Sequence, residues 1–146
     1  MRIEIVHGPN LNLLGQREPT IYGHSTLDEI NQRLQVVAQE LAVDIATFQS
    51  NHEGALIDHL QACLHTADAF ILNPAGYTHT SVALRDAILA IAKPTVEVHL
   101  SNPDAREGFR RTSLVADIVY ARIAGFGPLG YELALRGVVA HLRQVK

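Results

Sequence analysis

Two spacings of hydrophobic residues alternate along the chain, and together they predict strands separated by helices. Short runs rich in β-branched residues are typical of strands, whereas an apolar residue at every third or fourth position is typical of an amphipathic helix. The predicted strands are Arg2 to His7, Asp44 to Gln49, Ala69 to Leu72, Thr95 to Leu100 and Asp117 to Ala124. The predicted helices run from about Thr26 to Ala42, Glu53 to Thr66, Ser81 to Ala92 and Pro128 to Arg143.

The order of these elements predicts a doubly wound sheet. Repeated strand and helix units form a right-handed, mostly parallel sheet with helices on both faces. Thr26 and Glu29 have the spacing of a capping box at the start of the first long helix, and Pro94 prevents another helix from continuing. We therefore expect one α/β domain with the flavodoxin-like strand order 2-1-3-4-5. In such folds, ligands bind beyond the carboxyl ends of the strands.

Composition supports a single globular domain and argues against several classes of partner. The chain has 146 residues, of which 47% are hydrophobic and 18% charged, and a domain of this size can bury a core without disulfides or a structural metal. Cys63 is the single cysteine, so no internal disulfide can form. The net charge of −3 argues against nucleic acid or an anionic membrane as the main partner. With no apolar run of about 18 residues, we expect a soluble, cytoplasmic protein.

The fourth predicted strand brings a carboxylate and an imidazole onto one face. Side chains alternate along a strand, so Glu97 and His99 point the same way, opposite the aliphatic residues between them. The carboxylate can accept a hydrogen bond from one ring nitrogen and leave the other to exchange a proton with a ligand. A lone histidine is more often structural, but the carboxyl end of a central strand favours a catalytic one.

The connection after the first predicted strand, residues 8–23, is too long for a simple turn. It contains Asn10, Arg17 and Tyr22, and its glycines and prolines predict a lid at about residues 16–24. A surface loop with Tyr22 packed against the body is the alternative. After the third strand, Thr78 and Thr80 are most simply helix N-caps.

Other residue groups suggest either anion binding or tight turns. Arg106, Arg110 and Arg111 form a basic cluster suited to carboxylate or hydroxyl groups, with at least one of them expected on a solvated face.

Residues 125–130 match G-x-G-x-x-G, but too few residues follow for a second strand with the acidic residue that a dinucleotide site needs. They predict a tight turn with close helix packing instead. His52 lacks the second histidine of a zinc motif, so we expect no metal.

The motifs around these residues resemble the type II 3-dehydroquinate dehydratase family. They occur in the family's order and cover nearly the whole chain. The matching segments are Gly8-Pro9-Asn10-Leu11-Asn12-Leu13-Leu14-Gly15, Arg17-x-Pro19-x-x-Tyr22-Gly23, Gln49-Ser50-Asn51-x-Glu53-Gly54, Asn73-Pro74, Thr78-His79-Thr80-Ser81-Val82-Ala83-Leu84-Arg85-Asp86 and Glu97-Val98-His99-Leu100-Ser101-Asn102. One departure is His7, where many members have asparagine; it lies outside the catalytic set.

The resemblance implies a trans elimination of water from 3-dehydroquinate, through an enolate and without a cofactor, in the shikimate pathway. Tyr22 would be the base that removes the proton next to the ketone, and His99 the acid that protonates the departing hydroxyl. An ordinary tyrosine is only about 0.1% ionised at pH 7, so a nearby arginine is needed. Arg17 is the candidate, with Arg110 as a possible assistant.

The resemblance also implies the remaining site residues and the assembly. Asn10 would support the enolate through an ordered water, and Glu97 would orient His99. The remaining residues implied are Asn73 with the backbone N–H groups of Leu100 and Ser101 for the substrate carboxylate, and His79, Arg110 and Asp86 for the hydroxyls. Asp86 would reach in from a neighbouring subunit, because family members are dodecamers built from trimers.

Three other functions are compatible with a fold of this class: a non-catalytic receiver module, a flavin-binding module, and an enzyme that acts on a different small acid. A receiver module needs acidic residues at the ends of the first and third strands, where His7 and Asn73 stand, and a flavin module needs a Ser/Thr-rich loop after the first strand. A relative of the same fold that acts on a different small acid stays open. The type I route through an imine is not expected, because the only lysines, Lys93 and Lys146, are badly placed for it.

Overall fold

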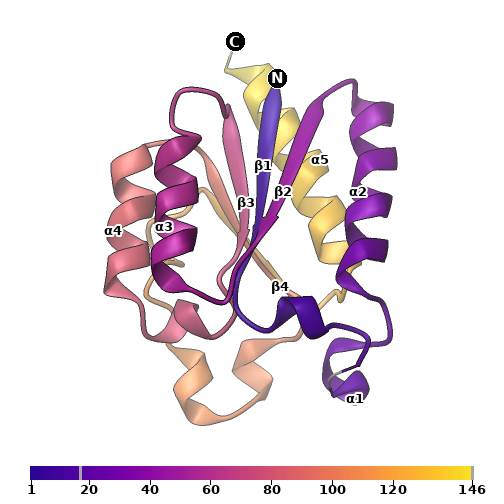
Figure 1. Cartoon of the computed structure of the whole chain (residues 1–146), viewed down its shortest axis with the longest axis vertical. Helices are drawn as coiled ribbons and strands as arrows, with labels where there is room; N and C mark the ends of the chain where they lie inside the picture. The colour runs from indigo at the N-terminus through magenta and orange to yellow at the C-terminus, as the bar shows by residue number, and fades with distance from the viewer. Residues whose placement is uncertain (17, 146) are drawn as a thin grey trace.

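The chain forms one five-stranded parallel sheet in the computed structural model, which describes residues 1–16 and 18–145 (Figure 1). The strands are β1 (Arg2–His7), β2 (Asp44–Gln49), β3 (Ala69–Asn73), β4 (Thr95–His99) and β5 (Ala121–Ala124). Their order is β2-β1-β3-β4-β5, and every neighbouring pair is parallel. The predicted flavodoxin-like order is confirmed.

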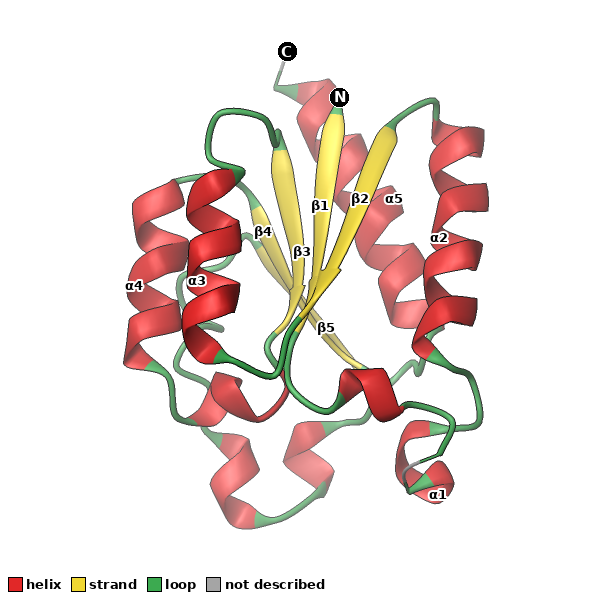
Figure 2. Cartoon of the chain, in the orientation of Figure 1, coloured by secondary structure: helices red, strands yellow, loops and turns green. Residues whose placement is uncertain are grey.

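Long helices cover both faces of the sheet and give each face its own core (Figure 2). The helices are α2 (Leu27–Leu41), α3 (Glu53–Ala62), α4 (Val82–Ile91) and α5 (Leu129–Gln144). Against α2 and α5, the strands bury residues such as Ile5, Ile71 and Val98. Against α3 and α4, the alternate positions of the strands bury Phe70 and Leu72. This alternation therefore decides which residues of β1, β3 and β4 face each pair of helices.

Side-chain caps define where two of these helices begin. Thr26 and Glu29 form the predicted capping box: the Glu29 backbone N–H donates to Thr26 Oγ1 over 3.2 Å, and the Thr26 N–H donates to the Glu29 carboxylate over 3.0 Å. At α4, Ser81 is the cap, since its Oγ accepts from the Leu84 N–H over 2.9 Å. The expectation that Thr78 and Thr80 are N-caps is therefore wrong.

Two element boundaries also differ from those predicted. The helix expected to reach Thr66 ends at Ala62, and the strand expected from Asp117 begins only at Ala121. Residues 117–120 form turns instead, and the β-branched Ile118 packs into the core beside α3 and α4. A β-branched side chain that packs into the core from a turn gives the same hydrophobic pattern in the sequence as a strand.

Short helical turns gather at the carboxyl ends of the strands, at the lower end of Figure 2. They are η1 (Leu11–Leu13), α1 (Pro19–Tyr22), η2 (Ala75–His79), η3 (Pro103–Ala105) and η4 (Gly108–Arg111).

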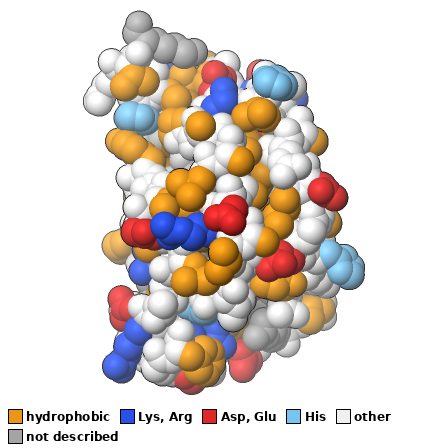
Figure 3. Space-filling view, turned by 90° about the vertical axis from the view of Figure 1, so that its left-hand side faces the viewer, with side chains coloured by type: hydrophobic (Ala, Val, Ile, Leu, Met, Phe, Trp, Pro, Cys, Tyr) orange, Lys and Arg blue, Asp and Glu red, His pale blue; other side chains and the backbone are white. Residues whose placement is uncertain are grey.

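The side of the molecule that carries α4 exposes hydrophobic side chains among charged ones (Figure 3). Among the described residues, no helix is both long enough and apolar enough to cross a membrane.

Candidate active site

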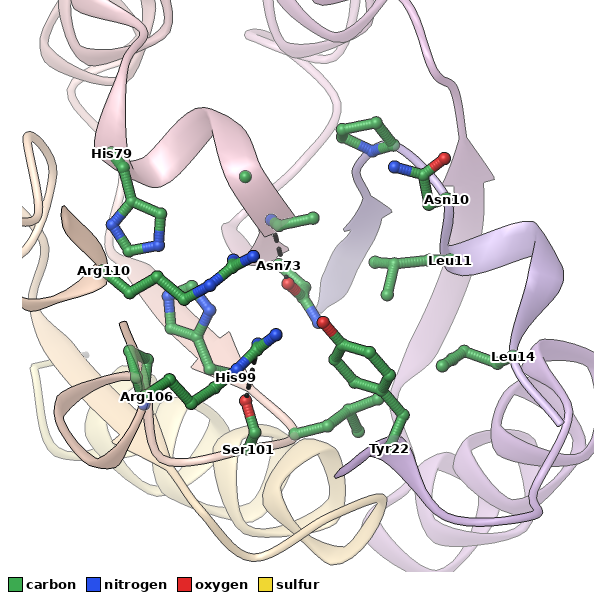
Figure 4. Close-up of a pocket in the computed structure, with 15 residues that line it drawn as sticks. Asn10, Leu11, Leu14, Tyr22, Asn73, His79, His99, Ser101, Arg106 and Arg110 are labelled. Atoms are coloured by element: carbon green, nitrogen blue, oxygen red, sulfur yellow. Dashed lines mark hydrogen bonds between the residues drawn. The ribbon is translucent and has the colours of Figure 1, made fainter. Parts of the chain in front are cut away.

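A cleft lies where the carboxyl ends of β1, β3 and β4 meet, and it gathers most of the predicted site residues (Figure 4). The predicted residues that line it are Asn10, Tyr22, Asn73, His79, His99, Leu100, Ser101 and Arg110. Arg17 lies outside the described residues. Asp86 does not line the cleft of this chain; it is exposed on α4. The sheet therefore collects side chains from distant segments at one edge, as its topology predicts.

The predicted pairing of Glu97 with His99 is present at the end of β4. His99 Nε2 lies 2.6 Å from Glu97 Oε1, and both side chains are buried. Because Nε2 is bonded to the carboxylate, Nδ1 is the ring nitrogen left for proton exchange with a ligand. The strand thus orients an imidazole toward the cleft and places a carboxylate against its other ring nitrogen.

Groups from three other segments hold the Glu97 carboxylate in its charged form. Thr78 donates a short hydrogen bond to Oε1, and the Ser113 hydroxyl donates to the same oxygen over 3.3 Å. Arg122 Nε, on the neighbouring strand β5, lies 3.1 Å from Oε2. Burial alone would raise the pKa of Glu97, but the hydrogen bonds from His99 and Thr78 and the charge of Arg122 outweigh it and lower that pKa below its usual range.

Thr78, Ser113 and Arg122 were missed as supports of Glu97. Thr78 was noticed in the sequence, but its place inside η2 turns its hydroxyl toward β4 instead of capping a helix. Arg122 is opposite Glu97 in the β4–β5 register, so the signal that could have found it is the pairing of the two strands. A strand that starts at Asp117, as predicted, does not show that Arg122 pairs with Glu97.

Tyr22 ends the short helix α1 and lines the cleft, with a cation close to its ring. The guanidinium carbon of Arg106 lies 5.2 Å from the ring centroid, and its Nη1 donates to Ser101 Oγ over 3.3 Å. Figure 4 shows Tyr22 and His99 pointing into the cleft from opposite parts of its wall. Arg106 was noticed in the sequence only as part of the basic cluster; its proximity to Tyr22 was not predicted.

His79 and Arg110 lie beside each other on one wall of the cleft (Figure 4). His79 Nδ1 lies 2.7 Å from the carbonyl oxygen of Thr112, to which it donates, so Nε2 is left for a ligand. Burial lowers the pKa of His79, and nearby cations lower it further. Arg110 Nε donates to Glu107 over 2.6 Å. A neutral imidazole and an arginine fork are both suited to binding hydroxyl oxygens.

The loop that carries Asn10 is held by close backbone packing. A Cβ at Gly8 would lie 2.6 Å from the carbonyl oxygen of Pro74, so only glycine fits there. The Asn10 N–H donates to Asn51 Oδ1 over 2.9 Å, and Gln49 Nε2 donates to the same oxygen over 3.2 Å. The motif segments after β1, β2 and β3 therefore fix one another next to the cleft.

The glycine-rich segment 125–130 is the tight turn that its sequence predicts. Gly125 and Gly127 have positive φ angles of 91° and 59°, and Gly130 packs closely on Val98 and Ile123. The Gly125 N–H donates to the carbonyl of His99 over 3.2 Å, and the Gly127 N–H to that of Leu100 over 2.9 Å. The turn thus anchors the backbone at the end of β4.

On the α3 face of the sheet, Glu4, His59 and Cys63 bring their ligand atoms within 4.8 Å of one another. His59 Nε2 lies 3.1 Å from Glu4 Oε2, and Arg2 Nε donates to the other oxygen of Glu4 over 2.8 Å. The spacing of the histidines in the sequence does not predict this cluster. The absence of a bound metal stays a prediction.

Comparison with known proteins agrees with these features. The family described as "Dehydroquinase class II" matches residues 1–139. A 3-dehydroquinate dehydratase of Campylobacter hominis is 51% identical over 146 residues, which are 100% of this chain and 94% of the relative. Another from Desulforudis audaxviator is 55% identical over 139 residues, 95% and 93% of the two chains.

Solved structures give the same result. The type II dehydroquinase from Propionibacterium acnes has a TM-score of 0.92 and 38% identity, covering 95% of this chain and 96% of its own. That from Butyrivibrio crossotus has a TM-score of 0.91 and 37% identity, covering 93% and 95%. With its strand order, its cleft and its motifs in agreement, this chain belongs to the class II dehydroquinase family.

Proposed function

We propose that this chain removes water from 3-dehydroquinate to give 3-dehydroshikimate, a hydro-lyase reaction of the shikimate pathway. Its family and the names of its relatives support this reaction. The observation that carries the proposal is the buried pair of Glu97 and His99 at the edge of a cleft that Tyr22 also lines. A binding module that performs no chemistry is not favoured, since it needs no such pair.

The reaction needs a base and an acid that act on neighbouring carbon atoms of the substrate. In our proposal, the Tyr22 phenolate takes a proton from the carbon next to the ketone, and the electrons of that C–H bond form an enolate. As the ketone re-forms, these electrons make the new C=C bond and the hydroxyl leaves the adjacent carbon. His99 gives that oxygen its proton, so the products are a conjugated enone and one water.

Other residues of the cleft would bind the substrate and stabilise charge. We assign the substrate carboxylate to Asn73 and the backbone N–H groups of Leu100 and Ser101, and the hydroxyls to His79 and Arg110. Asn10 would hold an ordered water at the enolate oxygen. All of these residues line the cleft, which supports the assignment.

The ionised form of Tyr22 needs a positive charge close to its ring. We propose that Arg17 supplies it, as the family resemblance implies, although this residue lies outside the described residues. Arg106 is already in place above the Tyr22 ring at 5.2 Å and supports the same charge. Two cations would then favour the phenolate from different segments of the chain.

We propose that residues 16–24 form a lid on this single catalytic domain. Gly15 precedes the segment and Gly23 lies near its end, with positive φ angles of 86° and 79°, and a Cβ at Gly23 would have no atom within 4 Å. Glycines of this kind can absorb a change in backbone direction. The lid would carry Tyr22 toward the substrate as it closes.

Self-association is a further part of the proposal, with a homododecamer built from trimers as the expected state. Asp86 would then contact substrate bound in a neighbouring subunit. It lies on α4 with Val82 and Leu89, whose side chains are 59% and 52% exposed, and apolar side chains at such positions favour a protein contact. A cytoplasmic location is also proposed, supported by the free thiol of Cys63.

The proposed reaction is tested with EDTA-treated protein and 3-dehydroquinate. We expect an increase in the ultraviolet absorbance of the enone, and no inactivation when borohydride and substrate are added together, because no imine forms. Quinate is the matched control, since without a ketone it can form no enolate. Absence of the enone, or a requirement for added metal, contradicts the proposal.

Replacement of the base gives a sharper test of the same function. Tyr22→Phe should remove turnover and leave the circular dichroism spectrum and melting temperature unchanged, because Tyr22 is only partly buried. Tyr120→Phe is the control, since the Tyr120 ring stacks on His141, outside the cleft. Near-normal turnover of Tyr22→Phe would place the base elsewhere.

A further inference from the structure

The segment between η4 and β5, residues 112–117, connects the wall of the cleft to helix α4. At its start, the Thr112 carbonyl accepts a hydrogen bond from His79 Nδ1 over 2.7 Å. At its other end, the Asp117 carboxylate pairs with Arg85 on α4, whose Nη2 donates to Oδ2 over 3.0 Å. The segment therefore joins a histidine that lines the cleft to an arginine that lies outside it.

Arg85 also binds the middle of this segment directly. Its Nη1 donates to the carbonyl oxygen of Leu114 over 2.7 Å and to Asp117 Oδ1 over 2.5 Å. The Arg85 side chain is 29% exposed, so these bonds are partly shielded from water. Because the guanidinium is planar and its N–H groups have fixed directions, they determine where the Leu114 carbonyl lies relative to α4.

The same segment is bonded to η2, the helical turn that carries His79. The Leu114 N–H donates to the carbonyl of Thr78 over 2.8 Å, while His79 donates to the carbonyl of Thr112. Two consecutive residues of η2 are therefore tied to two residues of the segment. A movement of the segment away from α4 would disturb both bonds, because Leu114 belongs to one of them and is held by Arg85.

The bond to Thr112 decides which nitrogen of His79 carries the proton. A neutral imidazole has a single ring proton, and the carbonyl keeps it on Nδ1, so Nε2 is left as an acceptor that faces the cleft. If the carbonyl moved away, the ring could turn and its proton could also lie on Nε2. The position of the segment therefore sets both the orientation and the tautomer of the ring.

We propose that Arg85 is a positioning residue, which acts through residues 112–117 to hold His79 in the orientation and tautomer that bind a substrate hydroxyl. This inference rests on the proposed function, in which His79 binds the substrate. The geometry that carries it is the series of bonds from the guanidinium to the Leu114 carbonyl, and from the Thr112 carbonyl to the imidazole.

The loss of Arg85 should affect substrate binding more than the chemical step. Ser113, in the same segment, donates to the Glu97 carboxylate over 3.3 Å, which is a long bond. That carboxylate keeps its contacts with His99 and Arg122, which come from β4 and β5. The acid of the proposed reaction therefore stays oriented when the segment is loosened.

Two substitutions of Arg85 test this expectation through KM. Arg85→Met keeps an apolar side chain of similar length but has no N–H donor. Its KM for 3-dehydroquinate should rise about fivefold, the scale of one neutral hydrogen bond, with kcat within about twofold. Arg85→Lys keeps a charged donor for the Leu114 carbonyl, so its KM should lie between those of the wild type and Arg85→Met.

A double variant and a matched control separate positioning from a general loss of stability. If Arg85 acts through His79, Arg85→Met should not raise KM further in the His79→Ala background, whereas an effect through Asp86 and a neighbouring subunit would add to it. Arg33→Met is the control, since Arg33 makes two bonds to Glu132 between α2 and α5, outside the cleft. It should lower the melting temperature without changing KM. Unchanged KM in Arg85→Met, or a further rise in the double variant, would overturn the proposal.

Solid-state nitrogen-15 NMR of histidine-labelled protein keeps this inference distinct from the proposed reaction. The His79 signals, identified by their loss in His79→Ala, should show a protonated Nδ1 and an unprotonated Nε2 at pH 8, whether or not 3-dehydroquinate is the substrate. Arg85→Met should show both tautomers. A single unchanged tautomer in that variant would overturn the inference even if KM rises. Conversely, the expected change in a protein that does not dehydrate 3-dehydroquinate would contradict the proposed function and leave the link from Arg85 to His79 in place.

Discussion

Glu97 and His99 are two residues apart on β4, and their side chains meet at 2.6 Å on the same face of the sheet. The carboxylate is held ionised inside the protein, so it stabilises a positive charge on the ring. This relationship makes His99 a better proton donor for a leaving hydroxyl than a histidine without a fixed partner, because the carboxylate holds the ring in one orientation.

Replacing this carboxylate should slow the chemical step. Glu97→Gln keeps the size of the side chain but removes its charge, and we expect kcat to fall about 100-fold or more, within the range of general acid catalysis. The measurement is kcat at saturating 3-dehydroquinate. Glu40→Gln, which removes a carboxylate paired with Arg136 on the surface, should leave kcat unchanged. Equal rates for the two variants would mean that Glu97 does not support His99.

The cation above the Tyr22 ring should be needed for turnover. Arg106→Gln removes the guanidinium 5.2 Å from the ring centroid, which disfavours the phenolate. We expect kcat to fall about tenfold, with a smaller change in KM. Arg136→Gln serves as the surface control. A higher KM with an unchanged kcat would show that Arg106 acts on substrate binding and not on the base.

The buried His7 should make the folded protein sensitive to mild acid. Above pH 6.5 the ring is neutral in both the folded and the unfolded chain, so it adds no pH dependence. Between pH 6.5 and its folded pKa of about 4, the unfolded chain binds a proton that the folded chain does not, and about 3 kcal/mol of stability is lost as the pH falls.

Urea unfolding at pH 7 and at pH 4.5 measures this loss. The wild-type protein should lose more stability between the two pH values than His7→Asn, which has no titrating group at this position. If both proteins lose stability equally, His7 is not the group responsible.

The close approach of Gly8 to Pro74 should make even a methyl group costly. In Gly8→Ala the new Cβ would lie 2.6 Å from a backbone oxygen, so β1 and the loop after β3 must move apart. We expect a loss of about 1–3 kcal/mol in unfolding free energy and a large loss of activity, because Asn10 follows Gly8 closely and Asn73 directly precedes Pro74.

Gly54→Ala is the matched control for that substitution. Gly54 lies in the helix α3, and a Cβ there would have no atom within 4 Å. The change should stabilise the protein by about 0.5–1 kcal/mol without affecting turnover. Equal stabilities of the two alanine variants would contradict the steric argument.

The predicted and missed parts of the site differ in the kind of contact they involve. Glu97 and His99 lie on one strand, so side-chain alternation alone places them together. Thr78 and Arg122 contact the same carboxylate from other segments. Thr78 is placed by the fold of η2, and Arg122 by the register of β5 against β4. Register depends on how whole strands pack, and the turn at residues 117–120, in which Ile118 and Val119 are partly buried, looks like a strand in the sequence. Periodicity describes each segment by itself. It therefore predicts the strands and helices of the fold, but not the contacts between side chains of different segments.

The glycine turn after β5 has a consequence for engineering. The N–H groups of Gly125 and Gly127 hold the carbonyls of His99 and Leu100. Neither these glycines nor Tyr131, in the helix that follows, line the cleft. A random-mutagenesis library selected for altered turnover should therefore yield variants near the carboxyl end of the chain that no substrate contact accounts for. Designers who restrict diversity to the cleft would exclude the positions that set its alignment.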